Sequence, residues 1–203
     1  MVVVVFLSVI NKISTILNTK GIIFEKLEGF IKKFYTNELI KGSILFIGFG
    51  LLYFIFTLLI EYFLWLSTIG RTILFWLFIA VESFLLIRFI AFPLFKLFKL
   101  QKGINYEEAS QIIGNHFTEV KDKLLNFLQL SNQDQTSELL LASIEQKAST
   151  LQPIPFSNAV NFSKNKKFLP YAIVPVLLLI LLFVTGNSAV ISNSFSRVVN
   201  YET

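Results

Sequence analysis

The chain has 203 residues, of which 54% are hydrophobic and 15% charged, and its formal net charge is +5. This composition is too apolar for an ordinary soluble domain, and the apolar residues are concentrated in long runs. The sequence has no cysteine, which excludes a disulfide framework and a thiolate metal site, and His116 is its single histidine, which excludes a multi-histidine metal site.

Residues 1–41 form an N-terminal segment that precedes the first long apolar run. Its opening, MVVVVFLSVI, is too short to span a bilayer and lacks the basic region and cleavage site of a signal peptide. Further on, Ile23, Leu27 and Phe34 recur at helical spacing, with lysines on the remaining surface. We expect an amphipathic helix in the membrane interface, although a helix packed on a soluble module has the same pattern.

A predicted transmembrane hairpin occupies residues 42–99. Two apolar runs, at about 43–66 and 72–95, are each near the roughly 20 residues that a helix needs to cross about 30 Å of hydrocarbon. The short STIGR connection makes the two helices antiparallel neighbours. Trp65 at one boundary, and Lys96 and Lys99 at the other, have the character of membrane-interface anchors.

Charged residues interrupt both runs. Glu61 and Arg88 lie near span ends, so we interpret them as residues that extend to the membrane surface. Glu82 lies midway between the ends of the second run and cannot reach either surface. A central charge costs roughly 2.5 to 3.5 kcal/mol, less than the roughly 4 to 8 kcal/mol that the apolar residues of this run return, so the span should insert.

Counting depth from the cytoplasmic side places Thr57 of the first span near Glu82. We therefore expect an intramembrane polar contact in which a neutral Glu82 is hydrogen-bonded to Thr57 or to a backbone carbonyl. Contact with a partner subunit and a proton or ion pathway are the alternatives.

Residues 100–167 are the one candidate soluble module. Asn105 and Glu108 have the spacing of a capping box, and the apolar stripe after them predicts a helix to about Leu130. A second stripe, from Leu140 to Leu151, predicts another helix that ends before QPIP. This helical hairpin is too small for a large core, so we expect it to pack on the membrane, the N-terminal helix or another copy.

The third predicted span covers residues 168–185 and is preceded by two further anchors, Lys166 and Lys167. We expect residues 186–203 to begin a larger extracytoplasmic region, with RVVNYET as the opening of a strand. Lysines are concentrated in residues 1–41 and 96–167, which predicts that these segments are cytoplasmic and that the C-terminus is extracytoplasmic. The predicted fold class is an all-α membrane protein with three transmembrane helices, a small cytoplasmic helical hairpin and an N-terminal amphipathic helix.

Motifs for nucleotide binding, zinc hydrolysis and triad hydrolysis are absent from the sequence, so we expect no catalytic residues, cofactor or small-molecule substrate. The basic residues flank spans and form no single patch, so we expect no nucleic-acid partner. The expected partners are the lipid bilayer and a second copy or another membrane or cytoplasmic protein.

Three stretches resemble a known family: KFYTNELIKGSILFIGFGLLYF (33–54), FPLFKLFKLQKGINYEEASQIIGNHFTEVKDKLLNFLQL (92–130) and SELLLASIEQKASTLQPIPFSNAVNF (137–162). They are similar to the N-terminal three-span region of the bacterial membrane-protein family catalogued as domain of unknown function 4175. The resemblance implies a multi-pass inner-membrane protein and supplies no catalytic residue. We interpret the chain as a non-enzymatic anchor or scaffold; the alternative is a subunit of a transporter or membrane enzyme complex that uses Glu82 in proton or substrate passage.

Overall fold

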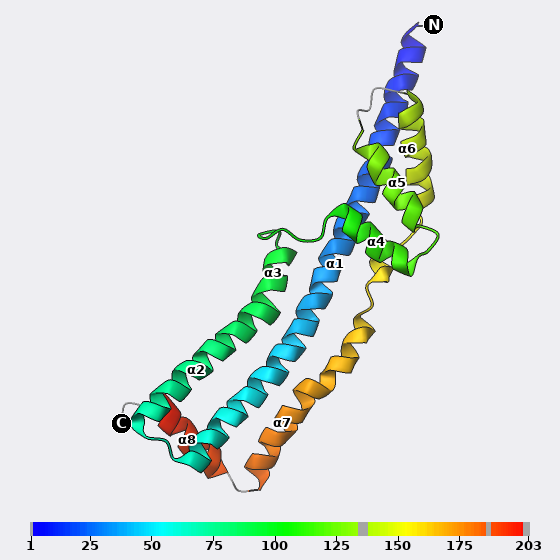
Figure 1. The fold of residues 1–203 in the computed structure, drawn as a ribbon. Helices are drawn as coiled ribbons and strands as arrows, with labels where there is room; N and C mark the ends of the chain where they lie inside the picture. The colour runs from blue at the N-terminus through cyan, green and yellow to red at the C-terminus, as the bar shows by residue number, and fades with distance from the viewer. Residues whose placement is uncertain (1, 134–137, 186–187, 201–203) are drawn as a thin grey trace. The chain divides into compact units, whose positions relative to one another are not determined.

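The computed structural model describes residues 2–133, 138–185 and 188–200, and the described residues form helices and their connections, with no strand (Figure 1). Three helical stretches are long and apolar enough to cross a membrane: Asn18–Leu64, Thr68–Leu97 and Phe156–Val184. The prediction of an all-α fold with three helices long and apolar enough to span a membrane is therefore confirmed for the described residues. The chain divides into two compact units.

The first unit, which we call the helical module, comprises Met1–Tyr35 and Lys102–Asn161. The second, the membrane unit, comprises Thr36–Gln101 and Phe162–Thr203. Helix α1 (Val2–Leu64) supplies its first part to the module and the rest to the membrane unit. The predicted N-terminal helix and first span thus belong to one helix.

In the helical module, α1 packs with three helices and a short 3-10 helix: α4 (Tyr106–His116), α5 (Lys121–Ser131), α6 (Glu138–Leu151) and η2 (Phe156–Ala159). The core is built from fully buried apolar residues of all of them: Ile23, Leu27, Phe30, Ala109, Ile113, Leu124, Phe127, Ile144, Ala148, Leu151 and Phe156. The apolar stripe of the N-terminal segment therefore faces protein, which is the second of the two arrangements its pattern allowed. Of the three surfaces on which the module could lean, the structure provides the N-terminal helix.

The ends of the module's helices have specific polar partners. The predicted capping box is confirmed, because Glu108 N–H donates to Asn105 Oδ1 at 2.7 Å and Asn105 N–H donates to Glu108 Oε2 at 3.0 Å. Two lysines of α1 bind backbone carbonyls at the C-terminal ends of α5 and α6. Lys20 Nζ donates to Ser131 O at 3.1 Å, and Lys26 Nζ donates to Gln152 O and, at 3.0 Å, to Ile154 O. A lysine at a helix C-terminus satisfies carbonyls that have no partner within the helix.

The prediction of one helix from about residue 105 to 130 is wrong, because α4 ends at His116 and α5 begins at Lys121. The reason is a sharp turn in which the chain returns onto Gly114. A Cβ built on Gly114 would lie 2.6 Å from Cβ of Lys121, closer than real side chains approach. Glycine also weakens a helix by about 1 kcal/mol relative to alanine, which favours a break there.

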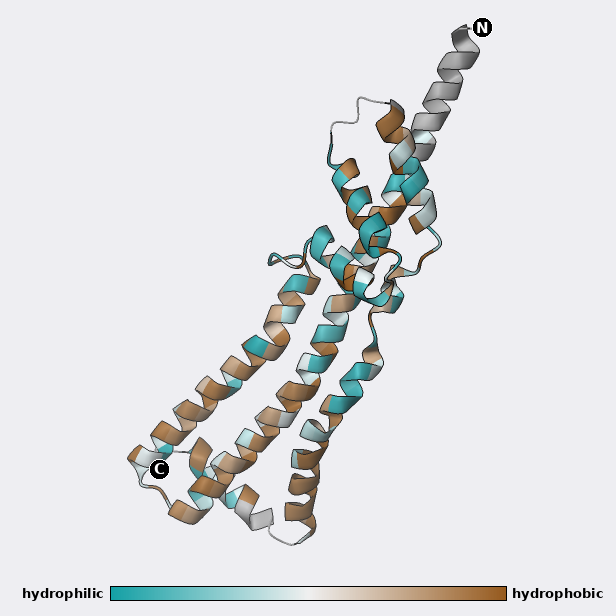
Figure 2. Ribbon diagram, turned by 45° about the vertical axis from the view of Figure 1, so that its right-hand side comes forward, coloured by the Kyte–Doolittle hydropathy of each residue, from teal (hydrophilic) through white to brown (hydrophobic). Residues whose placement is uncertain are grey.

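In the membrane unit, α1 is followed by α2 (Thr68–Leu86), the π-helical turn η1 (Ile87–Ala91), α3 (Phe92–Leu97), the 3-10 helix η3 (Phe162–Phe168), α7 (Leu169–Val184) and α8 (Ser188–Val199). Within this unit α1 lies between α2 and α7 (Figure 1). Figure 2 shows that the three long helices are predominantly hydrophobic. Many of their large apolar side chains are exposed, as lipid-facing residues are.

The expected strand in RVVNYET is wrong for its first residues, because Arg197–Val199 belong to helix α8; residues 201–203 lie outside the described part of the chain. The local reason is helical spacing. Ser194 and Val198, one helical turn apart, are buried while Ser196 between them is exposed, whereas a strand would place all three on one face.

Candidate functional site

Two backbone carbonyls, each four residues before a proline, lie against α1 where α2–α3 and α7 approach it. In an α-helix the carbonyl of residue i accepts from the N–H of residue i+4, and proline has no N–H. Pro175 thus removes the i+4 donor for Tyr171 O in α7. Phe89, four residues before Pro93, lies in the π-helical turn η1, where Phe92 N–H donates to Ile87 O, five residues back. Both carbonyls face α1.

Glycines of α1 receive these carbonyls. A Cβ built on Gly42 would overlap the Phe89 carbonyl oxygen, and one built on Gly48 would lie 2.5 Å from the Tyr171 carbonyl oxygen. Small residues allow transmembrane helices to approach at this distance, and Cα–H groups make weak hydrogen bonds to carbonyls. The Gly48 pairing therefore gives the Tyr171 carbonyl, which has lost its α-helical donor, a polar contact inside an apolar unit.

The predicted polar contact between Glu82 and Thr57 has a different geometry in the structure. Thr57 Oγ1 is buried and donates to Tyr53 O of its own helix at 2.9 Å. The Glu82 carboxylate lies instead against Gly50, where a built Cβ would be 3.0 Å from Oε2. One turn before Glu82, the Phe78 ring stacks on that of Tyr53 with centroids 6.0 Å apart. The structure thus brings Glu82 together with Gly50, two turns earlier in α1 than Thr57.

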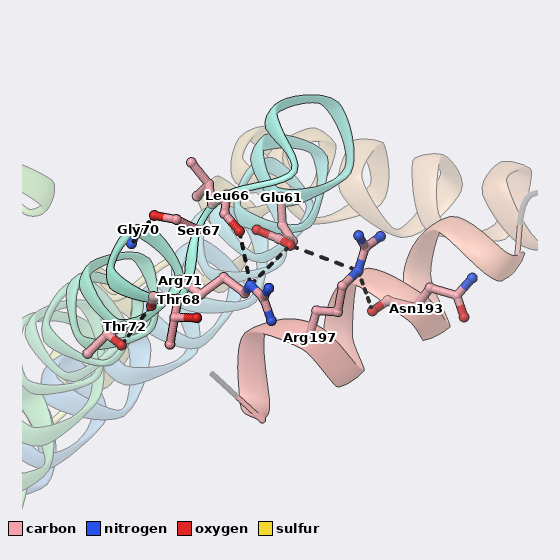
Figure 3. Close-up of polar contacts among 9 residues, drawn as sticks. All are labelled: Glu61, Leu66, Ser67, Thr68, Gly70, Arg71, Thr72, Asn193 and Arg197. Atoms are coloured by element: carbon pink, nitrogen blue, oxygen red, sulfur yellow. Dashed lines mark hydrogen bonds and ion pairs between the residues drawn. The ribbon is translucent and has the colours of Figure 1, made fainter. Parts of the chain in front are cut away.

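A buried carboxylate lies near the connection between α1 and α2. The Glu61 side chain is 1% exposed, with Arg71 Nε at 3.8 Å and Arg197 Nε at 3.9 Å from its Oε1 (Figure 3). Arg71 comes from α2 and also donates to Leu66 O at 3.1 Å, whereas Arg197 comes from α8. Glu61 therefore joins three helices by charge.

The sequence interpretation of Glu61 as a surface residue is wrong, because its carboxylate is enclosed between the two arginines. Arg71 could be expected near Glu61 from the sequence, because Arg71 is the single basic residue of the short STIGR connection. There was no reason to expect Arg197 there, because Arg197 is distant in sequence. The Arg197 guanidinium also lies 4.2 Å from the centroid of the Trp65 ring, a cation–π contact.

The predicted anchors lie at the ends of the membrane unit's helices. Trp65 is 72% exposed, as expected for an interface aromatic, and has a left-handed backbone conformation with φ of 44° where α1 gives way to the turn. Arg88 is exposed on η1, Lys96 belongs to the last turn of α3, and Lys99 is exposed just after it. Lys166 and Lys167 are both exposed on η3, immediately before α7.

Within the described part of the chain, no three His, Asp or Glu side chains gather as metal ligands. The buried polar groups of the membrane unit instead hold helices together, at Gly42, Gly48, Gly50 and Glu61. No protein-family model, curated protein or solved structure matches this chain.

Proposed function

We propose that this protein is a membrane anchor or scaffold that holds a small helical interaction module at the cytoplasmic face of a bacterial inner membrane. The observation that carries the proposal is the contrast between the two units. The module closes an apolar core, whereas the membrane unit exposes large apolar side chains along helices of spanning length. Such a surface is stable in lipid and costly in water.

The orientation in this proposal follows the basic residues. Lysines are concentrated in residues 1–41 and 96–167, which border the spans at the ends remote from the α1–α2 connection. Under the positive-inside rule the module is cytoplasmic, and the α1–α2 connection and α8 are extracytoplasmic. The bacterial inner membrane is the compartment implied by the resemblance to domain of unknown function 4175.

The sequence is free of cysteine, so labelling of single cysteines tests this topology directly. Thr68→Cys places a thiol at the exposed start of α2, beside the α1–α2 connection, and Gln146→Cys places one on the exposed surface of α6. A membrane-impermeant maleimide should label Thr68→Cys in intact cells. It should label Gln146→Cys only after the cells are permeabilised. The reverse pattern, or loss of the protein from membranes at alkaline pH, would contradict the proposal.

The anchor role requires a partner for the module, either a second copy or another protein. Leu139 on α6 is 81% exposed, which makes it a suitable position for a photo-crosslinking residue. Crosslinks from Leu139 should exceed those from Ser149 on the same helix. Recovery of a lone monomer from both positions in cells would argue against an interaction module.

The second candidate function uses Glu82, because its carboxylate lies inside a spanning helix against Gly50. A subunit that passes protons through this group should lose a proton flux in vesicles on Glu82→Gln with its folding unchanged. The anchor proposal expects no such flux in either protein.

A further inference from the structure

A groove runs along the open face of α1 in the membrane unit, between α2 and α7. Its volume is about 560 Å³, and its lining is large and mostly apolar; besides Tyr53, it includes four residues of α1, Phe49, Leu52, Phe56 and Leu59, with Leu85 of α2 and Leu178 of α7. The four α1 residues recur at spacings of three, four and three, so they form one face of the helix. Phe49, Leu52 and Phe56 on this face remain exposed, although the Phe49 ring also contacts Phe89 of η1 and Tyr171 of α7.

The lining favours a flexible chain as the occupant over another helix. Transmembrane helices that pack closely do so at small residues. The small residues of α1, Gly42, Gly48 and Gly50, are already used by α2–α3 and α7. Bulky side chains such as Phe56 and Leu59 keep a second backbone away and offer an acyl chain a wide apolar surface.

A basic cluster lies where this face of the unit begins. Lys41 Nζ and Lys167 Nζ lie 5.5 and 5.0 Å from the centroid of the same ring, that of Phe168. η3 is fixed on α1 because Asn165 Nδ2 donates to Asn37 Oδ1 at 2.9 Å. Residues 36–41 and 162–168 contain four lysines and one acidic residue, Glu38, which is 3.5 Å from Lys41. The cluster is thus net positive.

The basic cluster and the groove are continuous. Tyr171 follows Phe168 by one turn of α7, and its ring centroid is 6.0 Å from that of Phe49, where the groove begins. Phe49 lies eight residues after Lys41, about 12 Å along the helix. One leaflet supplies about half of the roughly 30 Å hydrocarbon core. A chain whose head group lies at Lys41 therefore reaches Phe49 and Leu52.

We propose that this face of the membrane unit binds an anionic phospholipid, with the phosphate between Lys41 and Lys167 and one acyl chain in the groove from Phe49 onward. The positive charge complements the phosphate, and the apolar lining complements the chain. The inference rests on the membrane location in the proposed function, but not on the orientation or on the partner of the module.

The test uses the full chain with Trp65→Phe and Trp76→Phe, and Leu52→Trp as a fluorescent reporter in the groove. The protein is reconstituted in phosphatidylcholine vesicles that contain a minor fraction of phosphatidylglycerol, with bromine on the acyl chains of one lipid at a time. Brominated phosphatidylglycerol should quench the reporter more than brominated phosphatidylcholine at an equal fraction. Lys41→Gln with Lys167→Gln should reduce this preference by about fivefold for each lysine.

The matched control is Lys96→Gln with Lys99→Gln, which removes the same charge from the last turn of α3 and the residues just after it and should leave the preference unchanged. Equal quenching by the two lipids, or an unchanged preference in the Lys41 and Lys167 variant, would overturn the proposal. Absence of quenching by both lipids, with a disulfide between copies of a Leu52→Cys variant, would also overturn it, because a second copy would then fill the groove. Cysteine labelling reports separately on membrane topology, so failure of lipid binding is distinguishable from failure of the proposed function.

Discussion

The two units of this protein are packed by opposite means. The helical module buries large side chains, such as Phe30, Leu124 and Phe127, in a common core. In the membrane unit large side chains face outward and the helices approach at glycines of α1. Water drives the first arrangement, since burial removes apolar surface from it. In lipid that driving force is absent between helices, so close van der Waals contact and polar groups decide the second.

The largest expected effect is on the module's core. Phe30→Ala removes a fully buried ring, so we expect the module to lose about 3 to 5 kcal/mol of unfolding free energy. Hydrogen exchange in α4, α5 and α6 should accelerate, while the membrane unit stays protected. The control is Phe63→Ala, because the Phe63 ring lies on the same helix and is 75% exposed. Equal losses in the two variants would remove the contrast between a buried core and a lipid-facing surface.

The glycines of α1 provide the reverse experiment, in which a side chain is added. Gly42→Ala places a methyl group against the Phe89 backbone carbonyl, which cannot rotate away, so we expect a loss of about 1 to 3 kcal/mol in mixed-micelle unfolding. Gly50→Ala meets the movable end of Glu82 and should cost less.

Gly29→Ala is the matched control in the same helix. A Cβ on Gly29 has no neighbour within 4 Å, so the substitution should stabilise by up to about 1 kcal/mol through helix propensity. Opposite signs at Gly29 and Gly42 are the expected result. Stabilisation at Gly42 would show that α2–α3 does not approach α1 through this residue.

The Glu61 cluster tests the role of polar groups in the membrane unit. Glu61→Gln removes the charge that faces Arg71 and Arg197. Because both arginines are partly exposed, we expect a loss of about 1 to 2 kcal/mol, below the cost of breaking a fully buried pair. Backbone exchange in α8 should increase most. Glu38→Gln, which breaks the exposed pair with Lys41, should cost at most about 0.5 kcal/mol; an equal effect would mean that Glu61 gains nothing from its burial.

The spans were predictable because the bilayer imposes a length and a composition that hydropathy reads directly. The stripe of Ile23 and Leu27 was also visible, but the surface that covers it was not, since lipid and protein satisfy the same pattern. The contact between Gly50 and Glu82 could have been predicted by counting residues from the turn between α1 and α2. Gly50 lies fourteen residues before the end of α1 at Leu64, and Glu82 fourteen residues after the start of α2 at Thr68, so depth should be measured from the turn.

Other parts of the candidate site differ in how far local sequence could reveal them. The Glu61–Arg197 pair joins residues 136 positions apart and depends on how α8 packs, which no local pattern encodes. The contacts between the Phe89 and Tyr171 carbonyls and the α1 glycines could be predicted from sequence in part. Pro175 identifies the Tyr171 carbonyl as one without an α-helical donor, whereas Pro93 alone does not reveal the π-helical turn that contains Phe89. Glycine is the residue that lets a neighbouring helix approach such carbonyls. Their assignment to Gly42 and Gly48 still required the structure.

The smallest expected effect concerns a polar contact on the module's surface. Tyr106 Oη donates to Glu28 Oε1 at 3.1 Å, which joins α4 to α1. Burial raises the pKa of Tyr106 above its ordinary value, and the hydrogen bond to the Glu28 carboxylate and its charge raise it further. The folded module thus holds this proton more tightly than the unfolded chain does. The stabilisation is complete below the unfolded pKa of about 10 and is lost as pH rises through the higher folded value.

Tyr106→Phe should therefore cost at most about 1 kcal/mol at neutral pH, since one partly exposed hydrogen bond is removed. The difference in unfolding free energy between the two proteins, measured by circular dichroism from neutral to alkaline pH, should stay constant up to about pH 10 and then shrink. Glu28→Gln keeps an acceptor but removes the charge, so the folded pKa of Tyr106 is raised less; the shrinkage should still begin at about pH 10, but it should be smaller and end at lower pH. A difference that grows with pH would have the wrong sign and would show that the Glu28 contact stabilises the ionised phenol.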